Sequence, residues 1–148
     1  MNTHPYLRAY LAGILIPTLV LPLLLALFIV LRICLHTPVP IEQALVFPMA
    51  LVPVLWGLWN MLWLVTHMRT HLPIGLHGAI LPLLLAPCGT IFATNMGVLK
   101  LLMWGLSWFN VVIIPWALIV PFFLAALIGY YLVWKYIVGF VNRVLGIA

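Results

Sequence analysis

Apolar residues fill four long stretches of this chain, and polar residues gather in the short connections between them. A helix that crosses a bilayer needs about 20 predominantly apolar residues. The pattern therefore predicts four transmembrane helices, at Tyr10–Leu35, Ala44–Val65, Ala79–Met103 and Val111–Trp134. Because short connections make consecutive helices antiparallel neighbours, we expect an all-α integral membrane protein. Its four helices would form an up-down bundle, as a single transmembrane domain over residues 1–148.

Each apolar stretch contains two prolines, five or six residues apart. A proline inside a helix removes a hydrogen bond and clashes with the carbonyl four residues earlier, although neighbouring helices make this tolerable in a membrane. We expect the second proline of each pair to kink its helix, at Pro22, Pro53, Pro87 and Pro121. Two readings of the freed carbonyls stay open: they only bend the helices, or they also coordinate a cation or a substrate donor.

The prolines also indicate an internal repeat. Pro17 and Pro22 recur at Pro82 and Pro87 with the same separation along the sequence. Two helices in each half would give a 2+2 repeat with both halves in one orientation, a parallel repeat. The alternative is chance similarity between segments built from the same few apolar residue types.

The chain is basic, with six Lys and Arg against one acid, Glu42, and a formal net charge of +5. Four of the cations lie on one side of the expected membrane, at Arg8, Arg69, Lys135 and Arg143, and two on the other, at Arg32 and Lys100. The positive-inside rule then places both termini in the cytoplasm, in what we expect to be a bacterial inner membrane. Membrane topology accounts for the charge, so no nucleic-acid partner is expected.

The scarcity of acids excludes several functions. The chain has no Asp, and Glu42 lies in a connection rather than in a span. Catalysis by paired carboxylates is therefore excluded, and carriers coupled to protons or sodium usually depend on a buried carboxylate. No nucleophile stands beside a base either, so we expect neither an enzyme nor a bound cofactor.

Two groups of residues within the spans could line a ligand site or a pore. They are Trp56, Asn60 and Trp63 on the second span, and Thr90, Thr94 and Asn95 on the third. Trp56 is expected near the middle of the membrane, where it could face a quinone, a lipid tail or an organic cation. The alternative is that the tryptophans pack against helices and the polar groups form hydrogen bonds between helices.

Small residues recur at every fourth position of the third span, at Gly89, Ala93 and Gly97, and Ala125 and Gly129 repeat this spacing on the fourth. Such spacing lets two helix backbones approach closely. It predicts tight helix packing, either within one chain or between copies.

His67 and His71 are four residues apart and could share one helical face, as zinc or haem ligands can. They are weak metal candidates, because a metal site needs further ligands and supporting groups. No Cys or acid lies nearby, and Pro73 would end the helix soon after His71. The competing interpretation is that both are interfacial histidines.

These patterns favour a non-catalytic subunit or packing partner of a membrane assembly. Its partners would be the lipid bilayer and either further copies of the chain or other membrane subunits. The alternative is a homo-oligomeric channel or carrier for a neutral or anionic small molecule. A third and weaker hypothesis is a membrane protein that binds haem or a metal through histidine.

Overall fold

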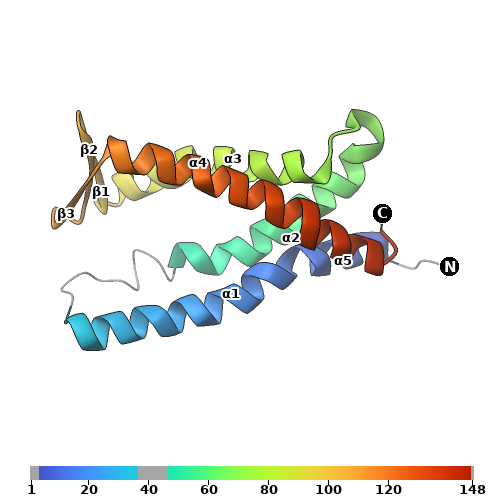
Figure 1. Ribbon diagram of the computed structural model, residues 1–148, viewed down its shortest axis with the longest axis horizontal. Coiled ribbons are helices and arrows are strands. Elements are labelled where there is room, and N and C mark those ends of the chain that lie inside the picture. Colours follow the sequence, from blue (N-terminus) through green and yellow to red (C-terminus); the bar gives the residue numbers. More distant parts are fainter. Residues whose placement is uncertain (1–3, 37–46, 148) are drawn as a thin grey trace. The chain divides into compact units, whose positions relative to one another are not determined.

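The computed structural model describes residues 4–36 and 47–147 (Figure 1). The described helices are α1 (Pro5–Leu35), α2 (Phe47–Thr70), α3 (Ile74–Asn95), α4 (Trp116–Leu132) and α5 (Gly139–Val144). A π-helical segment, η2 (Val133–Val138), joins α4 to α5. The described strands are β1 (Leu99–Leu102), β2 (Gly105–Trp108) and β3 (Val112–Pro115).

Four of the described helices are long and apolar enough to cross a membrane: α1, α2, α3 and the helix that continues from Trp116 to Val144. The four predicted spans are confirmed in this sense of length and composition. α1 begins earlier than expected, at Pro5, since proline suits the first helical turn. The predicted start of the second span at Ala44 lies outside the described residues.

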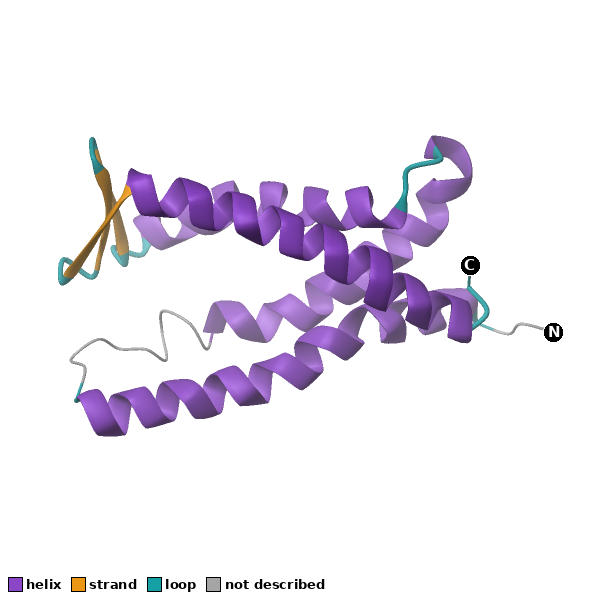
Figure 2. Cartoon of the chain, in the orientation of Figure 1, coloured by secondary structure: helices purple, strands orange, loops and turns teal. Residues whose placement is uncertain are grey.

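A three-stranded antiparallel sheet replaces the end of the predicted third span. The third helix ends at Asn95 and α4 begins at Trp116, so the predicted end of the third span at Met103 and the predicted start of the fourth span at Val111 are both wrong. The strands are arranged in the order β1-β2-β3, shown in orange in Figure 2. The described chain is therefore mostly helical but not all-α.

Local geometry explains where α3 stops. Gly97 has a φ of 71°, which suits glycine because it lacks a Cβ. Its N–H donates to the Thr94 carbonyl (3.0 Å), and the Val98 N–H donates to the Ala93 carbonyl (3.0 Å). This pair of bonds is the Schellman arrangement that closes a helix C-terminus.

The chain forms two compact units. Unit 1 comprises the described residues of Met1–Pro73 and Tyr136–Ala148, and unit 2 comprises Ile74–Lys135. In unit 1, α1 packs against α2 and also contacts α5. In unit 2, α3 packs against α4, and both helices contact the sheet. Unit 1 thus holds the first two candidate spans, while the parallel repeat itself stays a prediction.

The prolines expected to kink the helices, Pro22, Pro53, Pro87 and Pro121, all lie inside helices. α1, which also contains Pro17, is visibly bent in Figure 1. Pro115 instead precedes α4 as its N-cap residue, in an extended conformation. A coordinating role for the freed carbonyls stays a prediction.

Candidate functional site

Two asparagine side chains are fully buried against each other in unit 1. The Asn60 Nδ2 group donates to Asn142 Oδ1 (2.8 Å), and the Asn142 Nδ2 group donates to Asn60 Oδ1 (3.1 Å). Asn60 Nδ2 also donates to the Ala9 carbonyl (2.8 Å). We call Asn60, Asn142 and the Ala9 carbonyl the amide clasp. It connects α2 both to α5 and to α1.

The amide clasp depends on a close approach of α1 and α2. A Cβ built on Gly13 would lie 2.5 Å from the Trp56 carbonyl oxygen, and one on Gly57 would lie 2.5 Å from ring atoms of Tyr10. Neither position has room for a side chain. Ala9 lies one turn before Gly13 and is fully buried, so small residues at this spacing let the Asn60 amide reach the Ala9 carbonyl.

A second hydrogen bond ties the C-terminal segment to α1. Arg8 Nη1 donates to the Leu145 carbonyl (3.2 Å), directly after the end of α5. Carbonyls at a helix C-terminus lack partners within the helix, and a cation is favourable there. Unit 1 therefore holds its C-terminal segment through the Asn142 amide and the Leu145 carbonyl.

The predicted ligand residues Trp56, Asn60 and Trp63 share one face of α2, and all three are buried. His67 extends this face and stacks on Trp63, with ring centroids 4.6 Å apart. The His67 Nδ1 atom lies 2.9 Å from the Leu64 carbonyl oxygen. Because a carbonyl only accepts, Nδ1 carries the proton. This face of α2 is buried, and a ligand-lining role stays a prediction.

The second predicted group lies in unit 2. The Thr90 hydroxyl donates to the Ala86 carbonyl (2.8 Å), and the Thr94 hydroxyl donates to the Thr90 carbonyl (2.7 Å). Both hydroxyls therefore bond within their own helix. Asn95 is the last residue of α3 and is exposed. The two predicted groups thus belong to different units.

The small residues predicted to pack helices together make few close contacts among the described residues. Gly97 lies beyond the end of α3, so the prediction that it packs one helix against another is wrong. A Cβ on Gly89 or Gly129 would meet no described atom within 4 Å. Ala93 is half-buried and Ala125 is exposed. Contact between copies through these residues stays a prediction.

In unit 2, the close contacts are instead made by glycines at the start of α3. A Cβ on Gly78 would overlap the ring of Trp134, which is fully buried, and one on Gly75 would contact the Tyr131 ring. His77 is also buried and meets Trp134 edge to face, with ring centroids 6.1 Å apart. Sequence reasoning missed these glycines because it assigned them to a connection.

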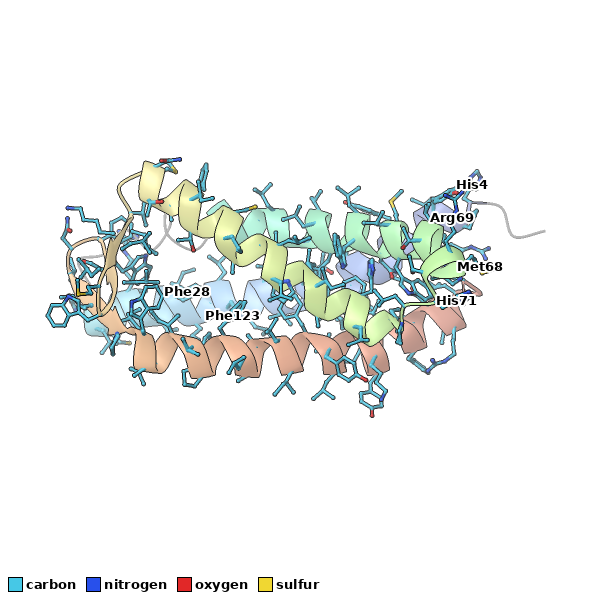
Figure 3. The ribbon with its side chains drawn as sticks, turned by 90° about the horizontal axis from the view of Figure 1, so that it is seen from above. His4, Phe28, Met68, Arg69, His71 and Phe123 are labelled. Atoms are coloured by element: carbon cyan, nitrogen blue, oxygen red, sulfur yellow. The ribbon has the colours of Figure 1, made fainter. Side chains whose placement is uncertain are left out.

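The two candidate metal ligands do not share a helical face. α2 ends at Thr70, and His71 follows it with a left-handed φ of 51°. Figure 3 shows His71 and Arg69 at this end of the helix. Within residues 4–36 and 47–147, no group of three or more His, Cys, Asp or Glu side chains is placed to hold a metal ion.

Asn142 is the functional residue that sequence reasoning missed. It lies beyond the predicted end of the fourth span at Trp134, close to Lys135 and Arg143. The available signal was its spacing of one helical turn from the apolar residue Val138. The structure buries both residues. Continuation of the helix to Val144 brings Asn142 into the unit 1 interior.

No family model matches this chain, and no match is found among the curated proteins or the solved structures. The amide clasp has hydrogen-bonding groups but no group that ionises near neutral pH. The chain's one carboxylate, Glu42, lies outside the described residues.

Proposed function

We propose that this chain is a non-catalytic subunit of a membrane assembly, which acts by packing against other membrane chains. The observation that carries the proposal is the amide clasp, because its polar groups bond to one another. Both N–H groups of Asn60 have acceptors, one on Ala9 and one on Asn142. A pore or a reaction centre instead needs polar groups that keep hydrogen-bonding capacity toward an opening.

The threonines of α3 support the same proposal. Thr90 and Thr94 donate to carbonyls of their own helix, which removes their donors from any polar path. Trp63 is a partial exception, since its buried indole nitrogen has no hydrogen-bond partner among the described residues. That nitrogen is enclosed by protein atoms, so a ligand could reach it only after a rearrangement.

α4 offers the surface through which a partner would pack. None of its described side chains is buried, so the helix faces its surroundings over most of its circumference. Gly129 has free space in front of it, and Ala125 lies one turn earlier. Small residues at this spacing allow a helix from another chain to approach closely.

We place the protein in a bacterial inner membrane with both termini in the cytoplasm. The support is the charge pattern, in which Arg8, Arg69, Lys135 and Arg143 would share the cytoplasmic side. Basic residues favour that side because they are retained there when helices insert.

The test is gentle detergent extraction from the native host at native abundance, followed by sizing and mass spectrometry. We expect a fixed set of companion proteins to co-elute with the chain. Gly129→Leu should release them without lowering the melting temperature, since a Cβ at this position meets no described atom within 4 Å. Ile128→Leu, which places the same residue type at an exposed neighbour without changing the side-chain volume, serves as the control.

Two results would overturn the proposal. A chain that elutes as a single copy has no assembly to join. A homo-oligomer without companions would favour the channel or carrier for a neutral or anionic molecule, to be tested by flux into vesicles.

A further inference from the structure

The chain passes between its two compact units twice. The first passage is Pro73–Ile74, between α2 and α3. The second is Lys135–Tyr136, inside the π-helical segment η2. Neither passage is regular α-helix.

The first passage is a short non-helical link. His71 has a φ of 51°, an uncommon conformation for a residue with a side chain. The His71 N–H donates back to the His67 carbonyl (2.9 Å), which ends the α2 hydrogen-bond pattern. Pro73 has no backbone N–H to donate, so no helical hydrogen bond can run through it. The link therefore interrupts the helical hydrogen-bond pattern between α2 and α3.

The second passage lies in an otherwise continuous helix. Regular α-helix precedes η2 in α4 and follows it in α5, and η2 itself spans six residues. π-helical turns are rare, and they occur often at functional sites and at bends. Their wider hydrogen-bond spacing makes such a segment the point where a long helix changes direction most easily.

Buried side chains hold the chain near both ends of η2. Trp134, the second residue of η2, is fully buried and lies against Gly78 and His77 of unit 2. Asn142 is fully buried in unit 1, where it pairs with Asn60. Residues 135–137, between these two attachments, are exposed, whereas Val138 is fully buried, so a rotation would be absorbed at residues 135–137.

Each unit contains a close contact that leaves no room for an added side chain. Gly13 and Gly57 in unit 1 leave no room for a Cβ, and Gly78 in unit 2 leaves none either. Interiors packed this closely do not deform smoothly, so motion concentrates in the connections between packed bodies.

We propose that residues 71–73 and η2 together form a two-part hinge, about which unit 2 turns as one body relative to unit 1. Collective motions of this kind occur on the microsecond to millisecond scale. The hinge goes beyond the proposed function and does not rest on it.

The native cysteines provide the first measurement. Cys34 lies in unit 1 and Cys88 in unit 2, and both are exposed. We would attach nitroxide labels to them and measure their distance distribution by pulsed electron resonance. The full chain would be held at one copy per nanodisc of phosphatidylcholine and phosphatidylglycerol.

Two label pairs within single units serve as controls. Cys34 pairs with Leu58→Cys in a Cys88→Ser background, and Cys88 pairs with Leu124→Cys in a Cys34→Ser background. Leu58 and Leu124 are both exposed. We expect the Cys34–Cys88 distribution to be about twice as wide as either control. An equally narrow distribution would overturn the hinge.

Deleting Tyr136, an exposed residue of η2, should convert the π-helical turn to regular α-helix and narrow the Cys34–Cys88 distribution to the control width. Tyr136→Ala keeps the length of the segment and should leave the distribution wide. A deletion variant that folds and stays wide would overturn the role of η2. Where the deletion prevents folding, the comparison of the three label pairs in the full-length chain decides whether the hinge exists.

Discussion

Unit 1 and unit 2 both bring helices together at glycines, but they secure the contact with different chemistry. In unit 1, the crossing at Gly13 and Gly57 is accompanied by the amide clasp, which joins three helices through hydrogen bonds. In unit 2, Gly78 receives the Trp134 ring, and the buried His77 meets that ring edge to face. Unit 1 is thus specified by polar pairing and unit 2 by the fit of an aromatic side chain.

The difference matters because, in lipid, the hydrophobic effect does not drive helices to associate. Hydrocarbon is as apolar as a leucine side chain, so helices in a membrane associate through close packing and hydrogen bonds. Losing a hydrogen bond and losing a close fit should therefore have separable costs in the two units. Substitutions confined to one unit measure each cost separately.

Gly78→Leu should have the largest effect. The new side chain would occupy the space of the Trp134 ring, which is fully buried. Overpacking of this severity lowers the free energy of unfolding by about 3 kcal/mol. The measurement is the melting temperature in mild detergent. Gly89→Leu is the matched control, since its Cβ meets open space, and equal melting of both variants would refute the aromatic fit.

Asn142→Leu should destabilise unit 1 by a smaller amount. It removes both bonds to Asn60 and leaves a buried amide without that partner. We expect the free energy of unfolding to fall by about 1–2 kcal/mol. The matched control is Asn95→Leu, since Asn95 is the exposed last residue of α3. A melting temperature as low for Asn95→Leu as for Asn142→Leu would argue against the clasp.

Gly97→Ala should cost about 1 kcal/mol, because Gly97 has a φ of 71° that a Cβ disfavours. Gly97→Asn should cost less, since Asn tolerates the left-handed region. The melting temperatures of the two variants distinguish an effect of the positive φ at Gly97 from a role in helix packing. A packing role would instead make the smaller Ala better tolerated than Asn.

Arg8→Met should have the smallest effect, about 0.5 kcal/mol. It removes the bond to the Leu145 carbonyl while retaining most of the apolar stem. Hydrogen–deuterium exchange should then speed up at residues 139–147 and stay unchanged in α3. Unchanged exchange at the C-terminus would mean that the bond does not hold this segment.

The sequence was sufficient for the four candidate spans, because length and hydropathy decide whether a helix can cross a bilayer. It was not sufficient for the end of α3. Residues from Val98 to Trp108 are apolar enough for either a strand or a buried helix, and periodicity cannot separate the two in a short run. The β-branched residues of β3 and the glycine at Gly97 were the available signals.

The site could be predicted only in part. Asn60 was identified as a polar residue within an apolar span, but its partner Asn142 is far away in the sequence and lies beyond the predicted end of the fourth span. Spacing also selected Gly89 and Gly129, whereas Gly13 and Gly78 make the close contacts. Spacing shows that a backbone can be approached, and only the fold determines which glycine is approached.

A double-mutant cycle on Asn60 and Asn142 measures whether the two buried amides depend on each other, as the proposed function requires. The free energy of unfolding would be measured in lipid for the parent, Asn60→Leu, Asn142→Leu and the double variant. We predict a favourable coupling of about 1 kcal/mol, with the double variant more stable than the sum of the single losses implies. A coupling of zero would mean that the two amides do not depend on each other, and Asn60 would again be a candidate for binding a ligand.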